Sequence, residues 1–301
     1  MTTRGTALAV RLDSVNKAFG RHQVLRDISW TVPKGHIVGL LGLNGAGKTS
    51  LLRILLGLAS PSHGTVEIDG TLLTDNTPEL RERVGYVPER PVIPSAFTAN
   101  RLEAVGRRAF PSWDANQYSA ALDRFRIPRS KPMYVMSQGQ RTLTALAFAL
   151  AHHADLLLLD EPTNGLDPVI RREFLSNLIE ESYDEGRTVI VSSHRLEEVQ
   201  HIAQDIAVLH HGEMVADGAL DDLLLHDRIL SWRQDTASDD VSDLPGARRA
   251  HWTDKQAAVY VRNFDETAIQ AAMEARGISH WTVRDVSLDE FFEERVTTDV
   301  G

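Results

Sequence analysis

The chain of 301 residues contains no cysteine and lacks an apolar run long enough to cross a membrane. Without cysteine, disulfides, thiolate metal sites and thiol catalysis are all excluded, which fits a reducing cytosol. A membrane helix needs about 20 consecutive apolar residues, whereas the longest candidates, such as residues 37–43, are interrupted by glycine. The first residues also lack the apolar stretch of a signal peptide. We therefore expect a soluble, cytoplasmic chain that serves a membrane process only by docking on a partner.

Basic residues are scarce relative to acidic ones. The chain has 32 lysines and arginines against 42 aspartates and glutamates, a formal net charge of −10. Because nucleic-acid binding needs a basic face, this balance argues against bulk nucleic-acid binding, although it leaves room for a local basic patch. The 42% share of hydrophobic residues is ample for a core in one large domain or two smaller ones.

Hydrophobic patterning predicts strands that alternate with helices. Residues 8–32 alternate with a period of two and turn at Gly20, which predicts two short antiparallel strands. Strands that alternate with helices imply a parallel sheet and the α/β class. The expected strands are residues 36–41, which we expect to be buried, 65–69, and the short apolar runs 156–159 and 188–191. The expected helical stretches are residues 49–56 and most of 98–150, with a break at 110–113.

The composition changes near residue 228, and residues 238–246 are polar and rich in turn formers. The last 70 or so residues have the pattern strand, hairpin, helix, strand, helix. We therefore expect two domains, a large one over residues 1–228 and a small α+β appendage over residues 229–301.

A phosphate-binding pattern follows the predicted strand 36–41. Residues 42–49 match G-x-x-x-x-G-K-[ST] between a buried strand and a helix, which is the context that this motif requires. Its glycines let successive backbone amides surround phosphate oxygens, and the helix N-terminus adds a positive dipole. Lys48 would reach the β- and γ-phosphates of ATP, and Thr49 would offer its hydroxyl to Mg²⁺. The predicted ATP-binding residues here are Gly42, Asn44, Gly45, Ala46, Gly47, Lys48, Thr49 and Ser50.

The apolar run 156–159 ends in two acidic residues, Asp160 and Glu161. Asp160 is predicted to help hold Mg²⁺, and Glu161 to polarise the attacking water as general base. Taken alone, a strand that ends in ordinary solvated acids would be the commoner explanation. Beside the phosphate-binding pattern, however, the pair indicates ATP hydrolysis.

Three further segments complete a resemblance to the ABC ATPases. Residues 136–140, Met-Ser-Gln-Gly-Gln, resemble the ABC signature L-S-G-G-Q; residues 160–168 resemble the joined Walker B motif and D-loop; and residues 191–194 resemble the segment with the switch histidine. The order of the motifs and their flanks extend the resemblance to about residues 8–225. The resemblance implies the P-loop NTPase fold of ABC type, with residues 1–228 as its nucleotide-binding domain. That domain would have an antiparallel β subdomain and a helical signature subdomain over about residues 95–145.

The resemblance also implies a reaction cycle. Two subunits would close head to tail around two ATP molecules, and hydrolysis would release them. Ser137 and Gly139 would contact the γ-phosphate bound by the other subunit, with Gln138 and Gln140 beside them. Asp167 would communicate between the two sites.

Two more residues take roles from the resemblance. His194 would contact the γ-phosphate and hold Glu161 and the water in register, the alternative being a solvated loop histidine. Phe19 would stack on the adenine ring, the alternative being a core phenylalanine. Both assignments depend on the motif context.

Glu89 departs from the family pattern, which has glutamine at this position. A carboxylate can coordinate Mg²⁺, but it cannot donate a hydrogen bond when it is ionised. We expect Glu89 to contact the nucleotide and the metal, and activity to be retained. Met136 and Gln138 also differ from the usual leucine and glycine, but neither change removes Ser137 or Gly139.

Residues 110–114 and 138–141 resemble bacterial subunits of the ABC-2, acetoin-utilisation and bacitracin-export type, which work with a separate permease. We therefore expect an ATP-hydrolysing subunit of a bacterial transporter, an exporter by analogy, on the inner face of the cell membrane. Its partners would be a second ATPase subunit, identical or not, and a membrane permease, with no nucleic acid. The alternatives are a soluble ABC protein of translation or repair, and a sensor or immunity subunit that signals through its ATP state.

Overall fold

The computed structural model describes residues 7–74, 77, 80, 82–233, 241–253 and 255–297, without the side chains of 181–185. The chain divides into two compact units, Met1–Met214 and Val215–Gly301. The domain boundary expected after residue 228 lies further along the chain and stays a prediction.

The first unit begins with an antiparallel sheet of order β2-β1-β4-β5. β1 pairs antiparallel with both β2 and β4, and Gly20, with φ 61°, provides the tight turn between β1 and β2. The two strands expected over residues 8–32 are thus confirmed. The four strands are β1 (Leu8–Phe19), β2 (His22–Pro33), β4 (His63–Ile68) and β5 (Thr71–Leu72).

A second sheet of the first unit has the order β10-β9-β3-β8-β7-β6, and its strands β9, β3, β8, β7 and β6 pair in parallel. Every residue of β3, β7 and β8 is buried, which explains their continuous apolar runs. The carboxyl ends of the parallel strands share one edge. The strands are β3 (Ile37–Leu41), β6 (Val84–Val87), β7 (Leu156–Asp160), β8 (Thr188–Ser193), β9 (Asp205–His210) and β10 (Glu213–Ala219).

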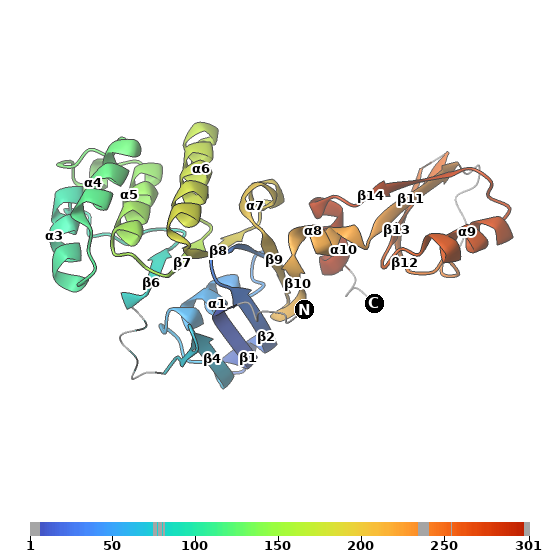
Figure 1. The fold of residues 1–301 in the computed structure, drawn as a ribbon, viewed down its shortest axis with the longest axis horizontal. Helices are drawn as coiled ribbons and strands as arrows, with labels where there is room; N and C mark the ends of the chain where they lie inside the picture. The colour runs from blue at the N-terminus through green and yellow to red at the C-terminus, as the bar shows by residue number, and fades with distance from the viewer. Residues whose placement is uncertain are drawn as a thin grey trace. The chain divides into compact units, whose positions relative to one another are not determined.

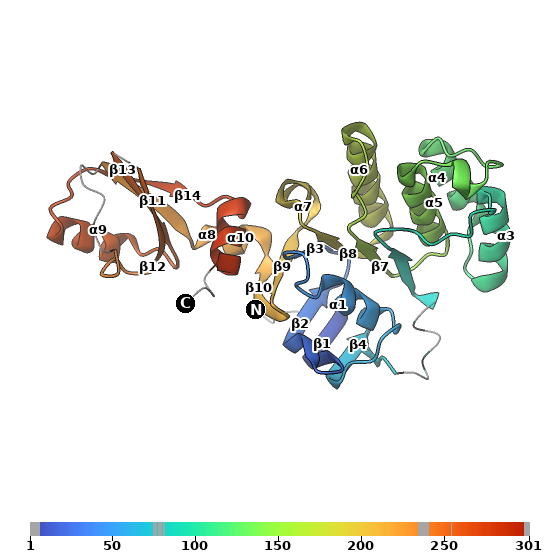
Figure 2. The same cartoon turned by 180° about the vertical axis from the view of Figure 1, so that it is seen from behind.

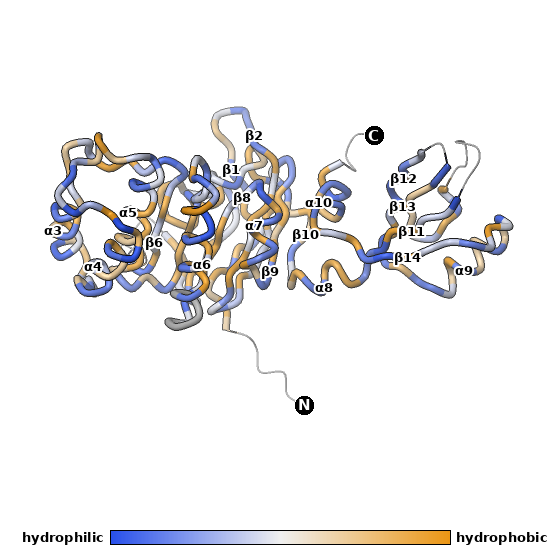
Figure 3. Tube along the Cα trace, turned by 90° about the horizontal axis from the view of Figure 1, so that it is seen from above, coloured by the Kyte–Doolittle hydropathy of each residue, from blue (hydrophilic) through white to orange (hydrophobic). Residues whose placement is uncertain are grey.

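The helices of the first unit pack into two hydrophobic cores. α1 packs against both sheets in one core, and α5 and α6 contribute to the other. Figures 1 and 2 show α3, α4 and α5 gathered on the side away from β1, β2 and β4, and Figure 3 shows polar and apolar residues alternating along the helices. None of the described helices is both long and apolar enough to span a bilayer. The helices are α1 (Lys48–Leu55), α3 (Ala99–Ala109), α4 (Ala115–Arg124), α5 (Gln138–Ala151), α6 (Pro168–Glu185) and α7 (Leu196–Ile202), with a 3₁₀ turn at Met133–Val135.

The second unit has a four-stranded sheet of order β12-β13-β11-β14, in which each described pair is antiparallel. Its core joins strand residues such as Leu230 and Val259 to Ile269 and Met273 of α9. The expected pattern of strand, hairpin, helix, strand, helix is confirmed. The elements are α8 (Leu220–Leu225), β11 (Arg228–Arg233), β12 (Ala247–Thr253), β13 (Gln256–Val261), α9 (Glu266–Ala275), β14 (Trp281–Asp285) and α10 (Leu288–Thr297).

Candidate active site

Most of the predicted site residues lie where four neighbouring strands end. β3, β8, β7 and β6 are consecutive in the parallel sheet. The phosphate-binding pattern follows β3, Asp160 ends β7, His194 follows β8, and Glu89 lies just beyond β6. In open α/β sheets, ligands bind at the carboxyl ends of the strands. Residues far apart in the sequence thus reach one edge.

The loop between β3 and α1 requires its glycines. Gly45 and Gly47 have φ of 82° and 111°, a region that disfavours other residues. A Cβ atom on Gly42 would lie 2.4 Å from the carbonyl oxygen of Leu209, and one on Gly47 would lie 2.8 Å from Cδ2 of Leu25. The backbone is therefore pressed against its surroundings up to the first residue of α1, and Asn44 and Gly45 remain exposed.

Lys48, the first residue of α1, is buried with 7% of its side chain exposed. Its Nζ donates to the carbonyl oxygen of Gly42 at 2.6 Å and lies 3.3 Å from Oε1 of Glu161. A buried ammonium group is costly unless it is paired. The lysine is thus held at the mouth of the glycine loop by one carbonyl and one carboxylate.

Glu161 connects this lysine to the switch histidine. Its side chain is 12% exposed, and its Oε2 lies 2.7 Å from Nδ1 of His194. Its backbone is in the left-handed region with φ 46°, a strained conformation of the kind that clusters at active sites. The side chains of lysine, glutamate and histidine are thereby connected in one chain of contacts, and the 42% exposure of His194 leaves that end open to a ligand.

Ser192 fixes the backbone beneath this chain. It is fully buried, its Oγ donates to Oδ1 of Asp160 at 2.8 Å, and it accepts from the amide of Glu161 at 3.0 Å. One hydroxyl therefore orients both acidic residues. Sequence reasoning did not identify Ser192, although a polar residue within the buried strand β8 was a usable signal.

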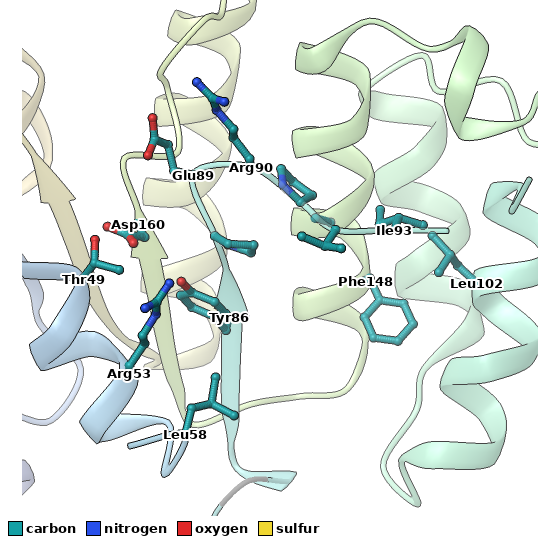
Figure 4. A pocket seen from close by; sticks show the side chains of 14 residues that line it. Thr49, Arg53, Leu58, Tyr86, Glu89, Arg90, Ile93, Leu102, Phe148 and Asp160 are labelled. Carbon is teal, nitrogen blue, oxygen red and sulfur yellow. The ribbon is translucent and has the colours of Figure 1, made fainter. Parts of the chain in front are cut away.

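A cavity of about 610 Å³ lies beside Asp160. Figure 4 shows Thr49 next to the Asp160 carboxylate, with Glu89, Tyr86 and Arg53 around it. Apolar side chains such as Ile93, Leu102 and Phe148 line the other end. Burial raises the pKa of Tyr86 to about 12, and the charge of Asp160 adds to the effect. The phenol thus stays protonated at neutral pH beside the Asp160 carboxylate. Sequence reasoning missed Tyr86.

The loop after Glu161 is tied down on two sides. Thr163 Oγ1 donates to Glu198 of α7 at 2.5 Å, and Glu198 also lies 3.2 Å from Nε of Arg171 on α6. On the other side, Asn164 Nδ2 donates to Oε1 of Glu89 at 3.1 Å. These contacts of Thr163, Asn164 and Glu198 could not be predicted from the sequence, because the partners in the two hydrogen bonds lie 35 and 75 positions apart along the chain.

The signature-like segment begins α5. Ser137 is its N-cap, and with Gln140 it forms a capping box, with both hydrogen bonds at 3.1 Å. A Cβ atom on Gly139 would lie 3.1 Å from Leu166, and one on Gly165 would lie 3.6 Å from the side chain of Gln138. This segment therefore packs on the loop that follows Glu161.

Asp167 and Phe19 also take clear positions. Asp167 Oδ1 accepts from the amides of Val169 and Ile170 at 3.0 and 3.1 Å, so it caps the start of α6. Phe19 is 54% exposed at the end of β1, with the ammonium group of Lys17 4.9 Å from its ring centroid. The alternative of a core phenylalanine is therefore excluded, and its adenine-stacking role stays a prediction.

Comparison with known proteins decides the family. The profile of the ABC transporter family matches residues 25–164. The chain is 35% identical over 216 residues to the bacitracin transport ATP-binding protein BcrA of Enterococcus faecalis, covering 71% of this chain and 70% of that protein. The chain belongs to the ABC transporter family. The predicted family, including its bacitracin-export type, and the predicted ATPase class are thus confirmed.

Similarity to other ABC proteins covers both sequence and fold. The Nod factor export ATP-binding protein I of Cupriavidus metallidurans is 29% identical over 296 residues, which covers 94% of this chain and 95% of that protein. A solved structure described as the ATP binding subunit of an ABC transporter matches with a TM-score of 0.66 and 27% identity, covering 71% of this chain and 91% of that chain. The predicted fold class is therefore confirmed, and the similarity to the Nod factor protein extends into the second unit.

Mg²⁺ is the cation expected in this ABC subunit. Among the residues that the structure describes, no three acidic or histidine side chains cluster as a metal cage. Mg²⁺ in phosphate-handling sites is usually bound by one or two carboxylates together with substrate phosphates and water. Thr49, Asp160 and Glu89 line one cavity and fit such a partial set.

Proposed function

We propose that this ABC subunit powers export from a bacterial cell by closing as a head-to-tail dimer around two ATP molecules and reopening after hydrolysis. It would act on the inner face of the membrane with a separate permease. The observation that carries the proposal is the convergence of Lys48, Glu161 and His194 at one edge of the parallel sheet. Relatives named for bacitracin transport and Nod factor export support the direction.

The three side chains have complementary tasks in hydrolysis. Lys48 would turn from Glu161 to the β- and γ-phosphates, since its charge suits phosphate at least as well as carboxylate. Glu161 would take a proton from water as the water oxygen bonds to the γ-phosphorus and the bond to the ADP oxygen breaks. His194, hydrogen-bonded to Glu161 at 2.7 Å, would orient that carboxylate and contact the γ-phosphate. ADP and inorganic phosphate are the products.

Magnesium would be held by Thr49, Asp160 and, from the cavity wall, Glu89, and when bound it would neutralise charge on the phosphates. Ser192 donates to Asp160, so it would fix the direction of that carboxylate. Hydrogen bonds from neighbouring residues commonly orient metal-binding side chains in this way.

The proposal of a dimer depends on the signature-like segment. Ser137 is exposed at the N-terminus of α5, a helix of 14 residues, where backbone amides and the helix dipole favour an anion. This end of α5 would receive the γ-phosphate of ATP bound by a second subunit. Asp167 and Phe19 are exposed as well, in keeping with the intersubunit and adenine contacts proposed for them. Since one chain carries both halves, a symmetric pair would have two complete sites.

The test is the variant Glu161→Gln, which keeps the size of the side chain but removes the base. We expect Mg-ATP to be bound, phosphate release to fall by at least about 100-fold, and a stable dimer to appear in light scattering with Mg-ATP but not with ADP. Glu180→Gln, an exposed glutamate of α6, is the matched control. Hydrolysis at the wild-type rate by Glu161→Gln would overturn the assignment.

A second measurement tests transport itself. The subunit should co-purify with a membrane protein when both are expressed together, and inside-out vesicles that carry the pair should accumulate substrate only with ATP. An ATPase that forms no such complex would favour the soluble or signalling alternatives.

A further inference from the structure

We propose that Asn164 is a positioning residue for turnover, which holds the Glu89 carboxylate against the loop that carries Glu161. The inference rests on the proposed function, because it concerns how the same site is assembled. It adds a residue to which the sequence motifs gave no role.

The geometry places Asn164 between the two glutamates. Its backbone amide donates to the carbonyl oxygen of Glu161 at 3.0 Å, and its side-chain Nδ2 donates to Oε1 of Glu89 at 3.1 Å. Both Asn164 and Glu89 are half-buried, so solvent screens their contact only in part. A single residue therefore connects the loop of the proposed base with the cavity wall.

The sheet makes this contact possible over a separation of 75 residues. β6 and β7 are parallel neighbours, with Val87 opposite Leu159. Glu89 comes two residues after β6, and Asn164 four residues after β7. Because both strands end at the same edge, the two loops meet there without any further element between them.

Chemistry fixes the direction of the hydrogen bond. An ionised carboxylate only accepts hydrogen bonds, so the amide nitrogen of Asn164, and not its oxygen, has to face Glu89. An amide in place of Glu89 could still accept the same bond through its oxygen. Two carboxylates at these positions would instead repel at a distance of about 3 Å.

Four combinations follow at positions 164 and 89, and only one of them breaks the contact. Asparagine pairs with glutamate or with glutamine, and aspartate pairs with glutamine by reversing the donor. Aspartate opposite glutamate is the single repulsive pair. This asymmetry separates a pairing role from a direct role of the Glu89 charge.

The experiment is a double-mutant cycle in the full chain with Asn164→Asp and Glu89→Gln. In the chain that retains Glu89, Asn164→Asp should lower kcat about tenfold, a common size for coupling between contacting residues. In the chain that already carries Glu89→Gln, the same substitution should cost less than about threefold. A tenfold loss in both backgrounds, or in neither, would overturn the proposal.

A further readout separates positioning from loss of the fold. The affinity for ADP measured with EDTA should be the same in Asn164→Asp as in the wild type, because the substitution leaves the glycine loop and Lys48 untouched. A loss of ADP affinity that matches the loss of kcat would contradict positioning.

Asn177→Asp provides the matched control. It makes the same substitution on α6, where Asn177 contacts Arg124 and the backbone of Glu173, and we expect less than a twofold change in kcat. The proposed function is checked separately in the same assay. A wild-type chain that hydrolyses no ATP would overturn both proposals, whereas an active wild type with an unaffected Asn164→Asp would overturn only this one.

Discussion

In the first unit, the carboxylates of Asp160 and Glu161 lie at the edge where parallel strands end, whereas Asp227 and Glu294 of the second unit are enclosed. Asp227 accepts from Tyr260 at 2.5 Å and from the amide of Asn263 at 3.1 Å, and Arg295 lies 3.1 Å away. The unit containing Asp160 thus keeps charge available for a ligand, while the second unit satisfies its buried charge internally. Buried acidic residues are structural where every oxygen is occupied by the protein.

The two units also differ in net charge. Residues 1–214 contain 23 lysines and arginines and 24 aspartates and glutamates, a net charge of −1, whereas residues 215–301 contain 9 and 18, a net charge of −9. The acidic balance of the whole chain therefore belongs almost entirely to the second unit. Net charge is informative for each unit separately, and the argument against nucleic-acid binding applies mainly to the second unit.

Removal of Asp227 should have the largest effect on the stability of the second unit. Asp227→Ala removes the buried acceptor of Tyr260 and one of the two buried carboxylates beside Arg295, the other being Glu294. We therefore expect the second unit to lose about 3 kcal/mol of unfolding free energy. ATP hydrolysis by the first unit should persist. Urea unfolding followed by the fluorescence of Trp232, Trp252 and Trp281 measures the loss.

The control for this substitution is Asp289→Ala, an exposed acid in the first turn of α10. Its expected cost is below about 1 kcal/mol, the usual size of a helix-dipole contact. Equal costs for the two variants would show that the enclosed cluster has no special structural weight.

Lys48→Ala tests the open cluster of the first unit. We expect ATP affinity to fall about ten- to a hundredfold, since a charged hydrogen bond contributes about 1.5–3 kcal/mol. Titration with a fluorescent ATP analogue measures the change. Lys131→Ala, an exposed lysine near α5, should bind the analogue as the wild type does, and undiminished affinity in Lys48→Ala would refute the phosphate-binding role.

The smallest expected effect is a dependence on pH within the second unit. Hydrogen bonds from Arg284, helped by Ser287, lower the pKa of Glu290 from 4.5 to about 2. This contribution to stability is therefore complete above pH 4.5 and is lost as the pH falls from 4.5 towards 2. The pair is partly exposed, so it contributes no more than about 1 kcal/mol.

Glu290→Gln checks that sign. The difference between its urea midpoint and that of the wild type should be present at pH 5 and shrink at pH 3. Glu266→Gln, an exposed glutamate in the first turn of α9, is the control. A difference that grows at low pH would contradict the assigned pKa shift.

The sequence predicted those parts of the site that lie within one continuous segment of the chain. Residues 42–49 are contiguous, and Asp160 and Glu161 are adjacent at the end of an apolar run. The hydrogen bond between Ser192 and Asp160 could not be predicted in this way, because it depends on β7 and β8 being neighbours. Local patterns specify segments, whereas contacts between loops depend on the order of strands.

The strand β6 escaped prediction for a related reason. It has only four residues, including Gly85, so its pattern was too short to name as a strand. The change of composition near residue 228 coincides with the start of β11, whereas the two compact units divide within β10, and the domain boundary after residue 228 stays a prediction.

The contacts of Lys48 have a consequence for the subunit before it binds nucleotide. The same ammonium group bonds a carbonyl oxygen of its own loop and lies beside the carboxylate of Glu161. One cation cannot fully satisfy that carboxylate and a polyphosphate together, so an arriving nucleotide would draw the cation away. Glu161 would therefore be released from this ion pair only once a nucleotide is bound, which couples the availability of the proposed base to the arrival of its substrate.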